Sequence, residues 1–256
     1  MANTVYSNKV LEAKAKDLLT TSVNTRSLMT VDTELAQNAG MTKTINTYTY
    51  TGTAEEVAAG VGNSNRGAIS YVGTDYTVKM VQQAFDYQDE DYMKDETIVD
   101  NMLKGANQVM VNKMAADFTE ELAKATLSHQ ASKFGYEAIV DGISTLNVED
   151  ESKLFVVIPN AWKAELRKDA DYKAARMGEV VYNGQVGTIC GIPVIATKAL
   201  TDAAYVMSPE AVKLFMKKDI EVEQDRNADK RTNSVYLRTA YVVALVDATK
   251  ICKITK

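Results

Sequence analysis

The chain has 256 residues, of which 46% are hydrophobic and 25% are charged, as expected for a folded protein with a buried core. Its longest apolar run, residues 240–246, is far too short for a transmembrane helix, and no signal peptide is visible at the N-terminus. The net charge is −5, and Lys and Arg are scattered along the chain. Composition therefore argues against membrane insertion and against specific DNA binding.

The first 40 residues predict an arm. Residues 10–19 have a helical composition, and the polar residues 20–25 end that helix. The arm has too few apolar side chains to form a core by itself. We therefore expect it to lie either on the rest of its own chain or on a neighbour.

Residues 41–81 predict a long two-stranded hairpin. Its first leg, residues 42–51, is rich in Thr, Tyr and Ile, and its second leg, residues 69–81, alternates with a period of two. A hairpin that is polar on much of both faces is only marginally stable alone in water. We therefore expect a second surface to hold it. The residues expected on one face of the second leg are Val72, Tyr76, Val78 and Met80.

An acidic and aromatic segment, residues 85–92, leads into the longest helical pattern of the chain, residues 95–127. A single helix of that length would span about 50 Å at a rise of 1.5 Å per residue. Its expected apolar face consists of Ile98, Val99, Met102, Ala106, Val109 and Met110. Its expected polar face consists of Asn101, Lys104, Asn107, Gln108 and Asn112.

The remainder predicts a compact α/β region. Helices are expected at residues 136–146, 161–168 and 208–215, the last because Ser-Pro-Glu is a helix-start signal. Strands are expected at residues 154–158, 188–197, 204–207 and 219–224, with one or two more within residues 234–254.

We predict no catalytic, cofactor or metal site. His129 is the only histidine and is expected to be exposed at a helix end. A Ser-His-Asp triad would have to use it as the general base, and we do not expect that role. Cys190 in an apolar strand is expected to act as a small hydrophobic residue, and Trp162 to anchor a core. The acidic residues 86–96 lack the spacing of a calcium loop. Gly60, Gly62 and Gly67 do not form a dinucleotide motif.

Several charged residues are candidates for contacts between subunits. Our hypothesis pairs acids at the start of the long helix with bases near the C-terminus, and adds charges at the hairpin tip. The acids are Asp89, Glu90 and Asp91, the bases are Lys217, Lys218, Arg226 and Arg231, and the tip residues are Glu55, Glu56 and Arg66.

Three sequence segments, in this order along the chain, resemble segments of a known family. They are Leu-Phe-Val-Val-Ile-Pro-Asn-Ala-Trp at residues 154–162, Gly-Thr-Ile-Cys-Gly-Ile-Pro-Val-Ile-Ala-Thr at residues 187–197, and Asp-Ile-Glu-Val-Glu-Gln-Asp-Arg at residues 219–226 followed by the closing strands. With the arm, hairpin and long helix, they resemble the Hong Kong 97-type major capsid proteins of tailed double-stranded DNA bacteriophages across the whole chain.

The resemblance implies an α+β fold with five parts. These are an N-terminal arm (1–40), an E-loop hairpin (41–81), a peripheral domain with a spine helix (82–130), an axial domain (131–205), and strands that return to these two domains (206–256).

The resemblance also implies a non-enzymatic shell protein without a cofactor. Such proteins assemble as hexamers and pentamers into an icosahedral head around DNA, in the host cytoplasm, with the E-loop over an adjacent subunit and the arm across a neighbour. We expect a separate scaffolding protein, a portal and possible decoration proteins as partners. The tip, residues 51–68, has no lysine, so an isopeptide crosslink is not expected.

Two alternatives stay open at this point. An encapsulin, which is a bacterial shell of the same fold around cargo enzymes, differs from a phage head in what the particle contains. A soluble α/β enzyme is the second alternative, and it lacks a convergent catalytic set.

Overall fold

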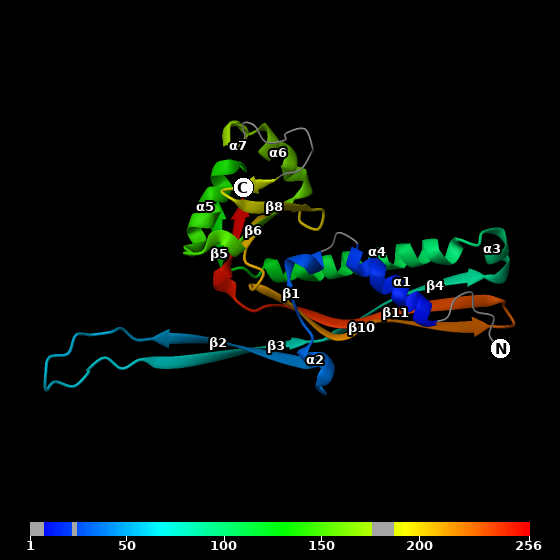
Figure 1. Cartoon of the computed structure of the whole chain (residues 1–256), viewed down its shortest axis with the longest axis horizontal. Coiled ribbons are helices and arrows are strands. Elements are labelled where there is room, and N and C mark those ends of the chain that lie inside the picture. The colour runs from blue at the N-terminus through cyan, green and yellow to red at the C-terminus, as the bar shows by residue number, and fades with distance from the viewer. Residues whose placement is uncertain (1–7, 22–24, 176–186) are drawn as a thin grey trace.

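The computed structural model describes residues 8–21, 25–175 and 187–256. Two sheets, a long helix and a projecting hairpin make up the described chain (Figure 1). The first sheet has four strands in the order β1-β10-β11-β4, in which β10, β11 and β4 are antiparallel. Their bounds are β1 Thr30–Asp32, β10 Val212–Asn227, β11 Thr232–Leu245 and β4 Lys79–Gln88.

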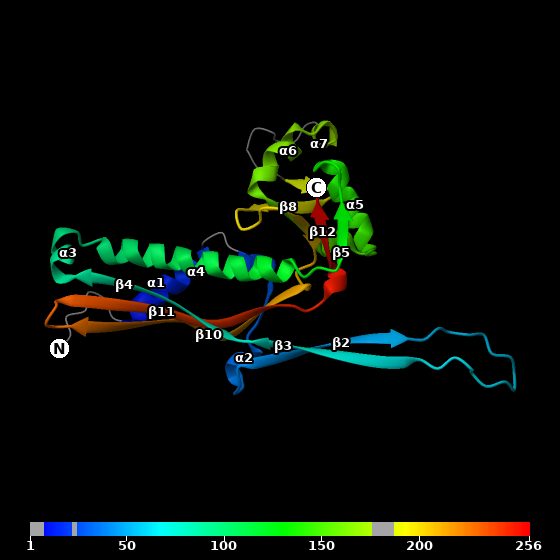
Figure 2. The same cartoon turned by 180° about the vertical axis from the view of Figure 1, so that it is seen from behind.

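Helices cover one face of this first sheet. The long helix α4 (Ile98–Leu122) and the N-terminal helix α1 (Asn8–Thr21) both pack there, and α3 (Asp89–Lys94) joins β4 to α4 (Figures 1 and 2). Leu11 and Ala15 of α1 are fully buried against this face. Helix α1 of the arm therefore packs on its own protomer, and contact of the arm with a neighbour stays a prediction.

The second sheet has six strands in the order β5-β12-β9-β6-β8-β7. Its core includes Phe134 and Trp162, whose ring centroids lie 4.7 Å apart, which confirms Trp162 as a core anchor. The strands are β5 Leu127–Gln130, β12 Ile251–Thr255, β9 Ala204–Met207, β6 Phe155–Pro159, β8 Ile192–Thr197 and β7 Thr188–Ile189. The helices around it are α5 Tyr136–Leu146, α6 Lys163–Lys168 and α7 Ala170–Ala175. Short 3-10 turns are η1 Thr25–Leu28, η2 Glu151–Lys153, η3 Asn160–Trp162 and η5 Ala248–Lys250.

The hairpin consists of β2 (Thr42–Thr51) and β3 (Ala68–Thr77), with the short helix α2 (Glu34–Gln37) beside its root. It leaves the body on the sheet face opposite α4 and extends past the body, away from the far end of β10 and β11 (Figures 1 and 2).

Two predictions near the hairpin and the long helix were wrong in extent. The second leg ends at Thr77, and residues 79–88 form β4 of the main sheet, so Met80 does not belong to the hairpin. Helix α4 has 25 residues and spans about 37 Å, not about 50 Å. Asn107, expected on its polar face, is buried and donates to the Leu103 carbonyl, whereas Val109 is half exposed.

Three local predictions in the second half were also corrected. Residues 208–215 do not form a helix, because Val212, Leu214 and Met216 alternate into the sheet core as the start of β10. Residues 188–197 form two strands, because positive φ angles at Cys190 (51°) and Gly191 (82°) make a tight turn between them. Cys190 is therefore exposed at that turn and does not act as a buried hydrophobic residue.

His129 was also misplaced. It lies on strand β5 and not at a helix end, with Nε2 3.6 Å from the Asp141 carboxylate.

Candidate assembly surface

The hairpin has two chemically different faces. Directly opposed pairs in the β2–β3 ladder include Tyr48 with Tyr71 and Tyr50 with Ile69, and side chains alternate across a strand, so these four share one face. They are 70%, 69%, 61% and 51% exposed, respectively, and the rings of Tyr48 and Tyr71 lie 6.5 Å apart. We call this group the tyrosine face.

The opposite face of the hairpin carries hydroxyl groups and Val72. Thr47 donates from its hydroxyl to the Val72 carbonyl, and Thr51 does the same to the Ala68 carbonyl. These hydroxyls find acceptors inside the hairpin. We call this side the threonine face, which consists of Thr47, Thr49, Thr51, Ser70, Val72 and Thr74.

The root of the hairpin is anchored in a small apolar cluster on the outer face of the first sheet. Val78 is buried there against Phe215 and Val242, and Ile45 and Tyr76 pack at its edge. The Tyr76 hydroxyl donates to the Leu245 carbonyl at 3.2 Å, and burial raises the pKa of Tyr76. Lys43 pairs with Glu34 of α2 at 2.6 Å. The hairpin is therefore fixed at its base and exposed along its length.

A buried polar network beneath the root was not foreseen from the sequence. Asp117 of α4, with a side chain only 6% exposed, accepts hydrogen bonds from the Tyr241 hydroxyl (2.9 Å) and the Lys113 ammonium (2.8 Å). Glu121 accepts from the backbone N–H of Leu245 and from Lys124. Burial, followed by the charge of Asp117, raises the pKa of Tyr241. These contacts tie the helix to β11 near the root of the hairpin.

At the tip, Glu55 organises the loop of its own hairpin. Its carboxylate accepts from the Ser64 hydroxyl at 2.9 Å and from the backbone N–H groups of Ser64 and Asn65. The hydrogen bonds from Ser64 lower the pKa of Glu55. Glu56 and Arg66 are exposed beside it. Of the three tip charges proposed to contact another subunit, Glu55 therefore already has a role within its own protomer.

Most of the other proposed contact residues have partners inside the protomer. Asp89 accepts from Asn233 and Arg226, both at 2.8 Å, and these bonds lower the pKa of Asp89. Lys217 donates to the backbone carbonyls of Leu35 and Asn38. The ion pairs are Arg226–Asp89 at 2.8 Å, Arg231–Glu90 at 3.0 Å, Lys94–Asp91 at 3.6 Å and Lys218–Glu221 at 2.6 Å.

These acids and bases therefore find partners within the protomer. For all of the proposed contact residues, contact with another subunit stays a prediction.

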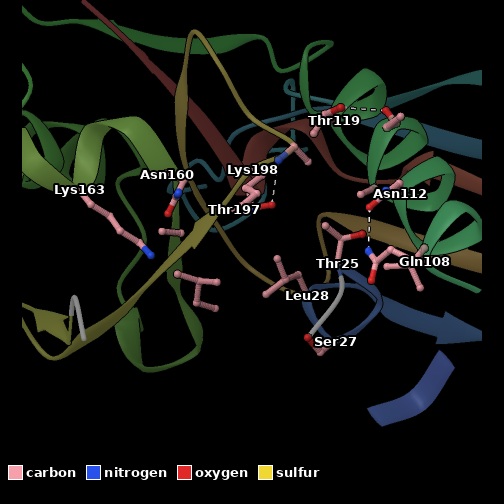
Figure 3. Close-up of a pocket in the computed structure, with 16 residues that line it drawn as sticks. Thr25, Ser27, Leu28, Gln108, Asn112, Thr119, Asn160, Lys163, Thr197 and Lys198 are labelled. Atoms are coloured by element: carbon pink, nitrogen blue, oxygen red, sulfur yellow. Dashed lines mark hydrogen bonds between the residues drawn. The ribbon is translucent and has the colours of Figure 1, made fainter. Parts of the chain in front are cut away.

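A cavity of about 750 Å³ lies between α4, η1 and the end of β8 (Figure 3). Lys163 and Lys198 lie on its walls, together with amide and hydroxyl side chains such as Asn112 and Thr119. The described lining residues include no carboxylate, histidine or cysteine, so this cavity holds no acid–base pair. Within the described residues, no cluster of His, Cys, Asp and Glu could hold a metal ion. In the same part of the chain, no helix is long and apolar enough to span a bilayer.

Comparison with solved structures identifies the fold. The mature capsid of bacteriophage PhiM1 superposes with a TM-score of 0.70 at 11% identity, covering 90% of this chain and 86% of that one. A virus-like particle from Pyrococcus furiosus has a TM-score of 0.66 at 11% identity, covering 96% and 98%. The chain has the α+β Hong Kong 97-type capsid fold.

Sequence comparison finds a relative whose name states its role. The "Major capsid protein" of Staphylococcus phage phiMR11 is 29% identical over 150 residues, or 57% of this chain and 55% of that protein. The match thus spans about half the length of that relative. No protein-family model matches the chain.

Proposed function

We propose that this protein is the major structural subunit of a tailed-phage head, and that hexamers and pentamers of it build an icosahedral shell around double-stranded DNA. The proposal is supported by the capsid fold over most of the chain and by the similarity to a major capsid protein. The proposed role is structural and requires no catalytic activity.

The observation that carries the proposal is the uncovered hairpin. Tyr48, Tyr50 and Tyr71 are each more than 60% exposed on a two-stranded ribbon that touches the body only near its root. Contiguous exposed apolar surface of this kind marks an interaction site, and an isolated hairpin is marginal in water. A shell supplies the missing cover, because every subunit presents both a hairpin and a neighbour.

We assign the parts of the chain accordingly. Residues 1–40 form the arm, 41–81 the E-loop, 82–130 the peripheral domain, 131–205 the axial domain and 206–256 the returning strands. Each contact between subunits need only be weak, because closed symmetry repeats it many times.

The proposed partners are those of a phage head. A separate scaffolding protein directs assembly, a portal occupies one vertex, and decoration proteins bind the outside where they are present. The shell is assembled in the host cytoplasm and becomes part of the virion. The scattered positive charge supports enclosure of DNA without sequence-specific binding.

Deletion of residues 54–66 tests the proposal. These residues lie in the exposed tip, which is remote from the buried clusters of the body, so the shortened subunit should keep its circular dichroism spectrum and unfolding midpoint. Sedimentation velocity should show loss of particles relative to the full chain. Particles of normal size from the shortened chain would remove the hairpin from the assembly mechanism.

A second candidate is a bacterial shell of the encapsulin type, which encloses cargo enzymes. A virus-like particle from Pyrococcus furiosus has the same fold over 96% of this chain, so the fold is common to both candidates. The contents of purified particles separate the two candidates, since a phage head holds genome and an encapsulin holds cargo protein.

A further inference from the structure

Beyond the proposed shell function, and without resting on it, we propose that the cavity between α4, η1 and the end of β8 binds a phosphate monoester of nucleotide size. The ammonium groups of Lys163 and Lys198 bind the phosphate. The organic group lies along the amide and hydroxyl side chains that α4 and η1 contribute to the cavity. The ligand class is a doubly charged phosphate joined to a polar group such as a nucleoside.

The cavity is positively charged on an acidic chain. The net charge of the chain is −5, yet the described lining includes two lysines and no carboxylate. Within the described residues, neither Lys163 nor Lys198 forms an ion pair or a hydrogen bond. By contrast, Lys113 and Lys124 near the end of α4 both pair with carboxylates. An ammonium group without a carboxylate partner is available to an anion, and lysine binds phosphate well as a compact charge.

A buried hydroxyl in the same cavity also lacks a partner. Thr25 is 3% exposed and lines the cavity, and its Oγ1 makes no hydrogen bond within the described chain. Figure 3 shows Thr25 beside Gln108 of α4. A buried hydroxyl without a partner costs free energy, which a ligand oxygen that accepts its hydrogen bond would recover. This observation is independent of the lysines and points to the same cavity.

The cationic and the amide side chains lie on different walls. Lys163 and Asn160 lie on one side of the cavity, and Gln108 and Asn112 of α4 lie on the other (Figure 3). Gln108 donates to Oδ1 of Asn112 at 3.0 Å, so the N–H groups of the Asn112 amide point to no acceptor among the described residues. One wall therefore suits a phosphate, and the other offers donors to the polar group joined to it.

The size of the cavity suits a nucleotide better than a bare ion. Its volume is about 750 Å³, and pockets for small molecules commonly measure about 300–1,000 Å³. Leu28, Val111 and Ile195 add apolar lining on which a ring can pack. A lining of apolar side chains with a few polar groups is the usual composition of a small-molecule site.

The cavity lies at the junction between the two sheets. Helix α4 and η1 pack on the first sheet, whereas β8 belongs to the second. A ligand that contacts both walls binds only when the two sheets keep their folded arrangement. Such a ligand should therefore raise the temperature at which the chain unfolds.

Calorimetric titration of the purified full chain with adenosine monophosphate tests the proposal. We expect one bound ligand per chain, an affinity that falls as the salt concentration rises, and a higher unfolding midpoint in its presence. Adenosine and inorganic phosphate each retain one part of the ligand. Each should bind roughly tenfold or more weaker than adenosine monophosphate, because each loses the contacts of one wall.

Lysine variants assign the phosphate position. Lys163→Met and Lys198→Met each remove one positive charge and keep the aliphatic stem, and each should weaken binding of adenosine monophosphate by roughly tenfold or more. Lys168→Met is the matched control, because Lys168 ends the same helix α6, is exposed and does not line the cavity. This control should leave the affinity unchanged. Circular dichroism verifies that all three variants are folded.

Thr25→Val separates a ligand contact from a structural role. The substitution replaces the hydroxyl with a methyl group of similar shape and breaks no hydrogen bond of the described chain. It should therefore raise the unfolding midpoint of the ligand-free chain and weaken binding of adenosine monophosphate by roughly threefold or more. An affinity equal to that of the unmodified chain would remove Thr25 from the site.

The proposal is overturned if adenosine monophosphate gives neither heat of binding nor a change in the unfolding midpoint. It is also overturned if both lysine variants bind adenosine monophosphate as tightly as the unmodified chain does. Equal affinity for adenosine would refute the phosphate position, and equal affinity for inorganic phosphate would refute the organic group. None of these results bears on the shell function, which is tested by the formation of particles.

Discussion

Asp117→Ala should destabilise the subunit far more than a comparable change at the surface of the same helix. The substitution leaves the Tyr241 hydroxyl, on a residue only 1% exposed, without its acceptor at 2.9 Å. Losing the charged partner of a buried hydrogen bond costs about 1.5–3 kcal/mol. The bond to Lys113 adds less than about 1 kcal/mol, because that side chain is 49% exposed. The expected loss in the free energy of unfolding is about 3 kcal/mol.

Asp100→Ala is the matched control. Asp100 lies on the same helix and pairs with Lys14 at 2.9 Å, but its side chain is 36% exposed, so its loss should cost no more than about 1 kcal/mol. Urea unfolding of dissociated subunits, followed by circular dichroism, measures both values. A difference of less than about 1 kcal/mol between the two variants would refute the view that burial gives the Asp117 network its strength.

Two further predictions follow from local geometry. Gly142→Ala should destabilise the subunit by about 1–3 kcal/mol, because its new Cβ would lie 2.6 Å from Cδ1 of buried Ile254. Gly105→Ala has open space around the new Cβ and should stabilise the subunit by about 0.5–1 kcal/mol. Thermal unfolding measures both changes, and equal effects would contradict the packing argument. The pKa of Asp89, measured by carboxyl-carbon NMR, should lie below the ordinary range of an aspartate, because Asn233 and Arg226 donate hydrogen bonds to its carboxylate; Asn233→Ala should raise that pKa. Because the folded-state pKa is lowered, its stabilising contribution is present above the unfolded pKa and is lost as the pH falls through the folded value. If the pKa of Asp89 is unchanged in Asn233→Ala, the hydrogen bond from Asn233 does not stabilise the ionised carboxylate.

Local periodicity was enough to predict the arm helix, the hairpin and the long helix, because each depends on side chains close together in sequence. Strand β4 was missed because Gln83 stands between Val81 and Phe85 in the series of inward-facing positions and breaks the apolar alternation. The helix expected at residues 208–215 follows a genuine start signal, but pairing of Val212 with Leu245 of β11 outweighs it.

The candidate surface was predictable only in part. That the hairpin needs a partner follows from its composition. The composition does not reveal which acids pair with bases inside the protomer. Asp89 and Arg226, for example, are 137 positions apart and meet only once β10 is folded. The buried role of Asp117 could not be predicted for the same reason, because its hydrogen-bond partner Tyr241 lies 124 positions away in the sequence.

The central claim is that this subunit is built to be completed by copies of itself. Negative-stain electron microscopy of the full chain, expressed with its genomic neighbours, tests that claim most directly. Closed, icosahedral shells of uniform size are predicted. A protein that stays a single protomer under these conditions, with the amides of its hairpin protected from hydrogen exchange, would contradict the account.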